Sequence, residues 1–288
     1  MTTTLVNFLA KVSVHLDDGW SSTTTSAGNT GGTTLVDSAL KKYPDGHFGD
    51  PNRDPQWWAY ISTTLLPVKN FTSSAGTIEL YSAYGAPTQI ASSTAYSLHK
   101  YDRDKKVLAC NQALYECYPD FYLRVDDETT LDGLGTSDID YAVPAAFTEF
   151  PDQIWKKHTS GSKITYTQIT DYDMKLLDGT WTFYANITES DDILLVGKTY
   201  LSQFTNDAST TELSAGQSHI VSYLAAAIFY EDFLDTVSAE NTGRFEALAR
   251  KRRDKYNELA NRNRMPRILP VRQNFAWTGE KQGRVWPA

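Results

Sequence analysis

Apolar residues near the start of the chain recur at helical spacing, which predicts a short amphipathic helix over residues 3–17. The residues on its apolar face are Leu5, Phe8, Leu9, Val12 and Leu16. The stretch that follows, residues 19–34, is rich in Ser, Thr and Gly. It is too polar to pack against a core, and it therefore predicts an extended surface loop.

The next part of the chain changes from a strand-like to a helical pattern. Aromatic and β-branched residues dominate residues 56–84, which predicts a small β unit. A helix is then expected to begin after Asp102, a residue type that caps helices, and to end before Pro119. Apolar residues three and four positions apart mark its buried face. They are Val107, Cys110, Leu114 and Cys117.

A second β region begins at Ile139. Short strand-like segments follow one another as far as Phe204, separated by turn signals such as Asp178-Gly179. The spacing of these segments is typical of a small antiparallel sandwich or barrel rather than of a parallel sheet.

Helical spacing returns near the C-terminus. Ser214 and Gln217 form a capping box at the start of one helix, and a second helix is expected over residues 244–262. Two helices joined by a short connection pack as an antiparallel pair. The last 24 residues, 265–288, contain three prolines and have arginines interleaved with aromatics. We expect an extended arm that orders against a partner; an arm that folds back on its own body is the alternative.

These patterns predict an α+β fold with an antiparallel, β-rich central region that forms a small sandwich or barrel. An N-terminal helix, one central helix, a C-terminal antiparallel helix pair and an extended C-terminal arm complete it. Residues 1–135 are expected to hold the N-terminal helix, the loop, the small β unit and the central helix. The antiparallel β domain is expected at 136–212, the helical pair at 213–263 and the arm at 264–288.

Cys110 and Cys117 are the only cysteines of the chain. On a helix they lie on nearly the same side but about 10.5 Å apart along the axis. A disulfide requires Cα atoms within about 7 Å, so the two cannot pair. The five histidines are scattered along the sequence, which argues against a zinc site. Both cysteines are therefore predicted to be reduced, buried packing residues.

The net charge of −8 is divided unevenly along the chain. Residues 244–288 contain 12 basic and 4 acidic residues, whereas the remainder contains 15 basic and 31 acidic residues. Such asymmetry predicts that the basic end contacts nucleic acid, an acidic partner or the acidic body of a neighbouring copy. A solvated helix face is the alternative. The basic helix face consists of Arg250, Lys251, Arg253 and Lys255.

No motif of a known catalytic site occurs in the sequence. A P-loop, a dinucleotide-binding glycine motif, a nucleophile elbow and a HExxH motif are all missing. The adjacent carboxylates Asp17-Asp18, Asp126-Asp127-Glu128 and Asp191-Asp192 are expected to cap helices or to lie in solvent. The protein is therefore predicted not to be an enzyme and to need no metal or cofactor. An enzyme whose two carboxylates lie far apart in sequence ranks last among the hypotheses.

Neither a secretory signal nor a membrane span is visible. The longest uninterrupted apolar stretch, residues 223–230, is far shorter than the ~20 residues that cross a bilayer. We therefore expect a soluble protein without a membrane partner.

Several segments resemble a recurring arrangement in structural proteins of tailed bacteriophages. The segments are "TTLVDSAL" (33–40), "WWAYIS" (57–62), "AGTIEL" (75–80), "TAYSLHKYDRDKKVLACNQALYECYPDFY" (94–122) and "DYAVP" (140–144). The positions that match a Y-x-L-H strand and the helix after it are Tyr96, Leu98, His99, Asn111, Ala113, Leu114, Tyr118 and Pro119. The C-terminal helices and their arm resemble the neck proteins that lie between portal and tail. The large β portion departs from the simplest neck adaptors, which are mainly helical.

The resemblance implies a structural virion protein of the neck, a head-to-tail connector or adaptor. It implies a ring of about twelve copies on the portal vertex, through which DNA passes during ejection. The implied partners are other copies of the chain, the portal protein, the next neck or tail protein and, non-specifically, the passing DNA. The implied location is the virion, assembled in the host cytoplasm. The residues expected to bind the portal or a neighbouring subunit are Arg264, Arg267, Arg272, Phe275, Trp277, Arg284 and Trp286.

A tail-associated module that binds a glycan or a receptor through the β region is the alternative function. Its candidate stacking platforms are Trp57, Trp58, Trp181 and Tyr184. Side chains alternate between the two faces of a strand, so about half of these aromatics are expected to point into the core instead.

Overall fold

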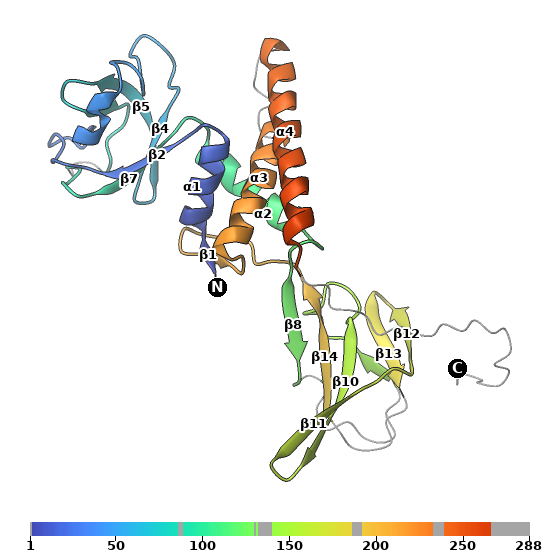
Figure 1. The fold of residues 1–288 in the computed structure, drawn as a ribbon. Coiled ribbons are helices and arrows are strands. Elements are labelled where there is room, and N and C mark those ends of the chain that lie inside the picture. The colour runs from blue at the N-terminus through green and yellow to red at the C-terminus, as the bar shows by residue number, and fades with distance from the viewer. Residues whose placement is uncertain are drawn as a thin grey trace. The chain divides into compact units, whose positions relative to one another are not determined.

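The structure, a computed structural model, has an α+β fold with antiparallel sheets, as the sequence predicts (Figure 1). It describes residues 2–85, 89–129, 131, 140–185, 192–232 and 239–265. The chain divides into two compact units. Unit 1 combines Met1–Phe121 with Leu201–Arg264, and unit 2 is built on Tyr122–Tyr200. Unit 2 is thus inserted in the chain between two parts of unit 1.

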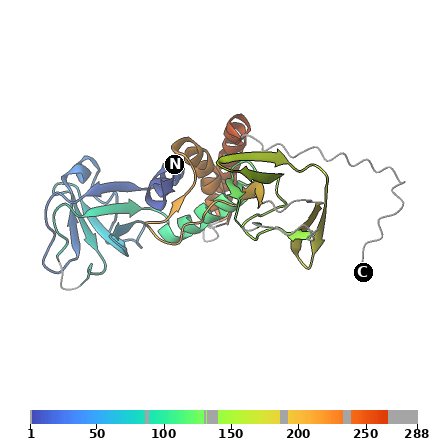
Figure 2. The same cartoon turned by 90° about the horizontal axis from the view of Figure 1, so that it is seen from below.

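The α-helices in the described part of unit 1 pack together. They are α1 (Leu5–His15), α2 (Arg103–Glu116), α3 (Ala215–Asp232) and α4 (Ala239–Asn263), and a short 3₁₀-helix, η1, covers Ser38–Lys42. Helix α3 contacts each of the other three α-helices, and Figures 1 and 2 both show it beside α4. Because apolar residues cover most sides of α3, it forms the centre of this helical core.

Local sequence accounts for where these helices begin. The Asp102 carboxylate caps α2 by accepting a hydrogen bond from the backbone N–H of Asp104 (2.8 Å). The capping box before α3 is confirmed, because Gln217 N–H donates to the Ser214 hydroxyl (3.3 Å) and Ser214 N–H donates to Gln217 Oε1 (2.9 Å). All five residues predicted for the apolar face of α1 are buried.

Helices α3 and α4 form the expected antiparallel pair. The ring of Tyr230, near the end of α3, stacks on that of Phe245, near the start of α4, with centroids 5.7 Å apart. Tyr223, earlier in α3, contacts a residue later in α4: the Arg252 guanidinium lies 6.0 Å from the centroid of its ring. Contacts that run in opposite directions along the two helices confirm the antiparallel arrangement.

A six-stranded antiparallel sheet forms the rest of unit 1, in the order β2-β7-β4-β5-β6-β3. Its strands are β2 (Trp20–Thr23), β3 (Thr34–Val36), β4 (Trp58–Ile61), β5 (Thr64–Thr72), β6 (Thr77–Leu80) and β7 (Ala95–His99). The hydrophobic core beside this sheet includes Leu35, Phe48, Ile61, Phe71, Ile78 and Leu98. A separate two-stranded ladder joins β1 (Thr3–Thr4) to β15 (Thr210–Thr211).

The prediction of a surface loop over residues 19–34 is wrong for Trp20–Thr23, which is the edge strand β2. Its backbone pairs with β7 in the antiparallel register Trp20↔Leu98. The backbone N–H and C=O groups of β2 are therefore satisfied by β7, and this pairing does not depend on apolar side chains. Just beyond the strand, Thr24 is buried, and its hydroxyl donates to the carbonyl of Ala91 (2.7 Å). Hydroxyl side chains can therefore enter this part of the sheet because backbone groups satisfy them.

Polar residues of the segments 33–40 and 94–122 bind partners that are distant in the sequence within unit 1. The buried hydroxyl of Tyr96 donates to Asp37 Oδ2 (2.7 Å), and Asp37 Oδ1 accepts from the backbone N–H of Ala39 at the start of η1 (2.8 Å). On α2, Asn111 donates to the carbonyl of Phe204 (2.9 Å) and accepts from its N–H (2.8 Å). These bonds join segments that are far apart in the sequence, so the motif residues specify tertiary packing.

Unit 2 contains two antiparallel sheets that include a half-barrel. One has the order β11-β10-β14-β8, with β8 (Leu123–Asp127), β10 (Gln153–Ser160), β11 (Lys163–Gln168) and β14 (Asp192–Thr199). The other has the order β12-β13-β9, with β9 (Asp140–Ala142), β12 (Tyr172–Leu177) and β13 (Thr180–Ala185). The core of the unit includes Ile154, Phe183, Ile193 and Leu195. The predicted antiparallel β region is thus confirmed.

Cys110 and Cys117 are free and fully buried, as predicted. Burial raises the pKa of each of the two thiols to about 12, so both stay protonated at neutral pH. Among the helices that the structure describes, none has the length and apolar character required to cross a bilayer.

Candidate functional site

The basic face of α4 divides into exposed and paired residues. Arg250 and Lys251 are exposed, whereas Lys255 lies 2.8 Å from Glu258 on the same helix. Arg253 is half-buried and pairs with carboxylates of two other helices. Its partners are Glu116 of α2 and Glu231 of α3. Arg253 therefore joins three helices of the core, and Arg250 and Lys251 are the exposed residues of this face.

One residue of the predicted C-terminal binding set lies within the described residues. Arg264 Nε contacts Asp120 Oδ1 at 2.9 Å, just after the end of α2. The others lie outside the described residues, and they are Arg267, Arg272, Phe275, Trp277, Arg284 and Trp286.

A buried ionic cluster lies at the junction of α1, α2 and the sheet of unit 1. Lys106 of α2 is fully buried, and its Nζ contacts Asp18 Oδ2 at 2.6 Å and His99 Nδ1 at 2.7 Å. Burial lowers the pKa of Lys106, and the carboxylate of Asp18 opposes this effect. The expectation that Asp18 caps a helix or lies in solvent is wrong, because the folded chain encloses it with a lysine 88 residues away.

The cluster extends to a serine but does not activate it. His99 Nε2 lies 2.8 Å from Ser97 Oγ. An ammonium only donates hydrogen bonds, so Lys106 makes His99 Nδ1 the acceptor and leaves the ring proton on Nε2. Burial, together with the charges of Lys106 and Arg103, lowers the pKa of His99 to about 3. A histidine in this tautomer cannot accept the proton of Ser97, so the triad-like arrangement is structural.

A second buried histidine stabilises the contact of α1 with α3. His15 Nε2 lies 3.0 Å from Ser222 Oγ, and its ring stacks on Tyr223 with centroids 3.8 Å apart. Arg252 of α4 donates to the backbone carbonyl of His15 (2.7 Å). Burial, followed by the positive charge of Arg252, lowers the pKa of His15 to about 4. His15 is therefore neutral in the folded protein near pH 7.

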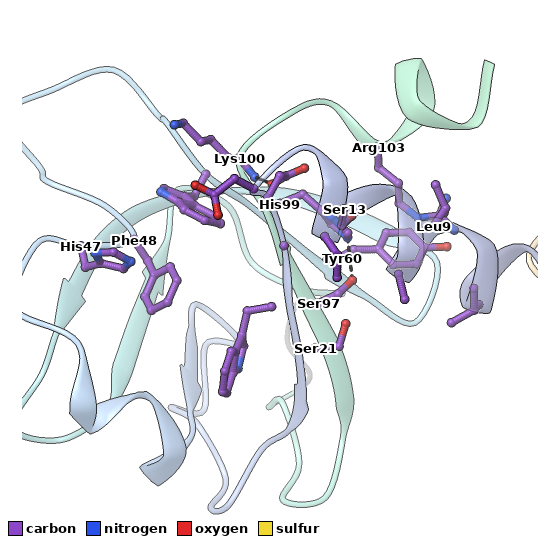
Figure 3. A pocket seen from close by; sticks show the side chains of 18 of the residues that line it. Leu9, Ser13, Ser21, His47, Phe48, Tyr60, Ser97, His99, Lys100 and Arg103 are labelled. Carbon is purple, nitrogen blue, oxygen red and sulfur yellow. Dashed lines mark hydrogen bonds between the residues drawn. The ribbon is translucent and has the colours of Figure 1, made fainter. Parts of the chain in front are cut away.

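A pocket of about 810 Å³ lies beside the ionic cluster, within unit 1 (Figure 3). Figure 3 shows His47 and Phe48 on one side of it, Leu9 and Tyr60 on the other, and His99 between them. Aromatic lining residues are Trp20, Tyr43, Phe48, Trp57 and Tyr60. Aromatic faces beside hydroxyl, imidazole and cationic groups are suited to a small polar ligand with an apolar face.

An ion pair between Arg103 and Asp207 holds the wall of this pocket that Tyr60 and Arg103 form. The Arg103 guanidinium lies 3.9 Å from the ring centroid of Tyr60, and both side chains contact the carboxylate of Asp207. Strand β4, helix α2 and the segment before β15 are thereby joined. Both polar groups at this wall are already paired, so Lys100 and Ser21 are better placed than Arg103 to bind a ligand.

The aromatic residues considered as stacking platforms do not share one site. Trp57 lines the pocket in unit 1, and Trp58 lies in strand β4 of the same unit. Trp181 and Tyr184 belong to β13 of unit 2, where Trp181 packs against the core.

Unit 2 exposes a concentration of large apolar side chains. Ten large apolar residues are exposed among those described, and five of them lie on β11 and β12. They are Ile164, Tyr166, Met174, Leu176 and Leu177. Isolated exposed apolar residues are normal, but such a concentration on two short strands indicates a contact surface.

Sequence reasoning missed the ionic cluster, although one signal for it was present. Lys106 precedes Cys110 by four residues and therefore lies on the same face of α2 as the buried cysteines. A lysine on an otherwise buried stripe requires a partner, but the sequence does not say which. No pattern linked Asp18 or His99 to it.

Within the described ranges, no group of three or more His, Cys, Asp or Glu side chains could hold a metal ion. A scan against models of known protein families found no match, and a search of curated proteins found no relative of this chain.

Proposed function

We propose that the protein is a structural virion protein of a tailed phage. In this proposal about twelve copies form a ring that connects the portal of the capsid to the tail and lines the DNA path. The portal, the next neck or tail protein and neighbouring copies are its partners, and it performs no catalysis. The resemblance of the segments between residues 33 and 144 to phage structural proteins supports this proposal.

The observation that carries the proposal is the exposed apolar surface of β11 and β12. Large apolar side chains on edge strands are unfavourable in water and promote association with other chains. A subunit of a ring needs surfaces that bind its neighbours. The basic residues Arg250 and Lys251 would serve contacts with an acidic partner or with passing DNA, whose phosphates attract cations without sequence preference.

Purified virus particles from the source test this function directly. We expect quantitative mass spectrometry to find about twelve copies per particle, the same copy number as that of the portal protein. Tens to hundreds of copies would instead assign the chain to the tail or shell. Absence from the particles would contradict a role in the virion.

The C-terminal arm is expected to be needed for assembly but not for folding. A chain that ends at Met265 should keep the circular dichroism spectrum of the full chain, because the helices and strands that the structure describes all lie within residues 3–263. It should not join the portal in co-sedimentation experiments. A full-length chain with a scrambled arm of the same composition controls for length and charge.

Either of two results would contradict this expectation. A truncated chain that co-sediments with the portal like the full chain would show that the arm is dispensable. A truncated chain that unfolds would show that the arm belongs to the core. If the scrambled arm binds as well as the native one, charge alone carries the contact.

The pocket of unit 1 favours glycan or receptor binding as a second candidate function. Its wall of aromatic side chains offers stacking faces, and Lys100 and Ser21 offer polar contacts. If it binds a carbohydrate, we expect saturable changes in tryptophan fluorescence. The change Trp57→Ala should weaken binding about tenfold or more, equivalent to about 1.4 kcal/mol. Trp181→Ala, in unit 2, is the matched control, and a flat titration of the unaltered protein would exclude this function.

A further inference from the structure

We propose that copies of this chain associate head to tail through unit 2, with the β10–β11 hairpin of one copy packing along β12 of the next. That this association closes into a ring rests on the proposed function. The contact itself is supported by the edge strands of unit 2, by their exposed apolar side chains and by their charges.

Strands β11 and β12 are edge strands in the sheets that the structure describes. Strand β11 begins the order β11-β10-β14-β8, and β12 begins the order β12-β13-β9. Residues 163–167 and 173–177 are all exposed. An edge strand presents a row of backbone N–H and C=O groups that another strand can pair with. Strands β8 and β9 form the other ends of these two orders, and β11 and β12 are the ends at which apolar side chains are exposed.

Strand β12 carries apolar side chains that the described residues of unit 2 leave exposed. In the antiparallel register, Met174 lies opposite Phe183 and Leu176 lies opposite Trp181. Residues directly opposite each other point to the same face of the sheet. Phe183 is fully buried in the core of the unit, yet Met174 and Leu176 on that same face are 39% and 53% exposed. The apolar face therefore continues past the part that the described residues of this copy cover.

The β10–β11 hairpin offers a complementary apolar surface. Ile164 and Tyr166 alternate along one face of β11, which Trp155 of β10 shares through the register Trp155↔Gln168. Ile164 is 51% exposed. In Figure 1 the tip of this hairpin projects away from β12 and β13. A hairpin that points away from the open edge of its own unit is available to the open edge of another copy.

Charge complementarity identifies a second copy as the occupant. Residues 153–168, the hairpin, contain three lysines and no carboxylate. Residues 169–185, which include β12 and β13, contain three aspartates and one lysine. Lys157 pairs with Glu128 and Asp192 within its own unit, and Lys163, at the start of β11, is exposed.

The same charges select the head-to-tail arrangement. A contact of β11 with β11 would bring two basic hairpins together, and a contact of β12 with β12 would bring two acidic ones together. Like charges facing each other across an interface are costly. A contact between two different surfaces repeats from copy to copy, and it produces a ring where the rotation closes.

Two single substitutions test the contact on the full-length protein. Ile164→Asp removes the apolar surface of the hairpin, and Leu176→Asp removes that of β12. Both positions are half-exposed, so an aspartate can be accommodated, and circular dichroism checks the fold. Leu108→Asp on α2, which is 56% exposed but lies in unit 1, is the matched control. Native mass spectrometry reports the masses.

The wild-type chain and the Leu108→Asp control should form oligomers at high protein concentration. Each of the other two variants alone should remain monomeric. Their equimolar mixture should form a one-to-one dimer and stop there, because only one of the two contacts in such a chain of copies is intact. This outcome requires β11 of one copy to meet β12 of another.

Other outcomes overturn the inference. A variant that oligomerises like the wild type shows that its strand is not part of the contact, and Leu176→Asp alone forming dimers points to β11 meeting β11. A mixture that stays monomeric shows that the two strands do not meet. If the full-length chain stays monomeric and a chain that ends at Met265 oligomerises, the chain's own arm covers the edge strand β12. The proposed function fails by a different measurement, the copy number in virus particles.

Discussion

The free energy of unfolding is expected to decrease as the pH falls from about 6.5 to about 4, because two buried histidines cannot accept protons in the folded protein. In the unfolded chain both have ordinary pKa values near 6.5. In the fold, burial lowers the pKa of His15 to about 4 and that of His99 to about 3. Between these limits the unfolded chain binds protons that the folded protein does not.

The sign and size of the effect follow from this difference in proton binding. Stability is complete above pH 6.5 and is lost as the pH falls toward the folded pKa values. Each histidine contributes about 1.36 kcal/mol per pH unit within its window, so the two together contribute about 2.7 kcal/mol per pH unit. Urea unfolding followed by tryptophan fluorescence between pH 4 and 8 measures it.

Substitutions assign the slope to particular histidines. His15→Asn and His99→Asn should each flatten the pH dependence by about half, whatever they do to stability at pH 8. His158→Asn is the control, because it removes a histidine that is exposed on β10 and leaves both buried sites intact. A slope that is absent between pH 4 and 6.5, or one that survives both buried substitutions, would contradict the assignment.

Removing one partner of the buried Asp18–Lys106 pair is expected to cost about 3–5 kcal/mol of unfolding free energy. Asp18→Asn keeps the shape of the side chain and an acceptor for the backbone N–H of Lys100, which Asp18 binds in the fold. It leaves the ammonium of Lys106 without a counter-charge in a fully buried position. Urea denaturation of the variant at pH 7.5 measures the loss.

A second substitution separates the uncompensated charge from other effects. Adding Lys106→Met removes the buried charge and keeps an apolar stem of similar size, so the double variant should recover more than half of the lost stability. Glu79→Ala is the matched control, because Glu79 and Lys69 form a pair of similar length, 2.7 Å, with both side chains 40% exposed. That control should cost less than about 1 kcal/mol. A double variant less stable than Asp18→Asn would show that the pair is not the source of the loss.

The buried pair and the edge strand β2 show why some features escape prediction. Lys106 stands on a helical stripe with Cys110, so its burial follows from local spacing. Its partner Asp18 stands next to Asp17 in a turn, where a carboxylate ordinarily faces water. Likewise Trp20–Thr23 is polar by sequence and becomes a strand only because β7 pairs with it. In both cases the deciding partner is more than 70 residues away.

The sequence by itself determined the local elements and their inner faces. Helical spacing identified the apolar side of α1, capping residues identified the starts of α2 and α3, and the geometry of a helix excluded a bond between Cys110 and Cys117. These features depend on residues within one or two turns of each other, so a linear pattern contains them. The antiparallel character of the β regions followed from short strands and frequent turn residues in the same way.

Only the tertiary structure decided which distant segments meet. It joined α1, α2, α3 and α4 in one core, although the chain of unit 2 separates α2 from α3. It also paired the strands, enclosed Asp18 with Lys106, and left β11 and β12 at sheet edges with apolar residues exposed. Such contacts depend on the entropy cost of bringing distant segments together and on which apolar surfaces bury each other from water. These are properties of the whole chain, and no local pattern of residues records them.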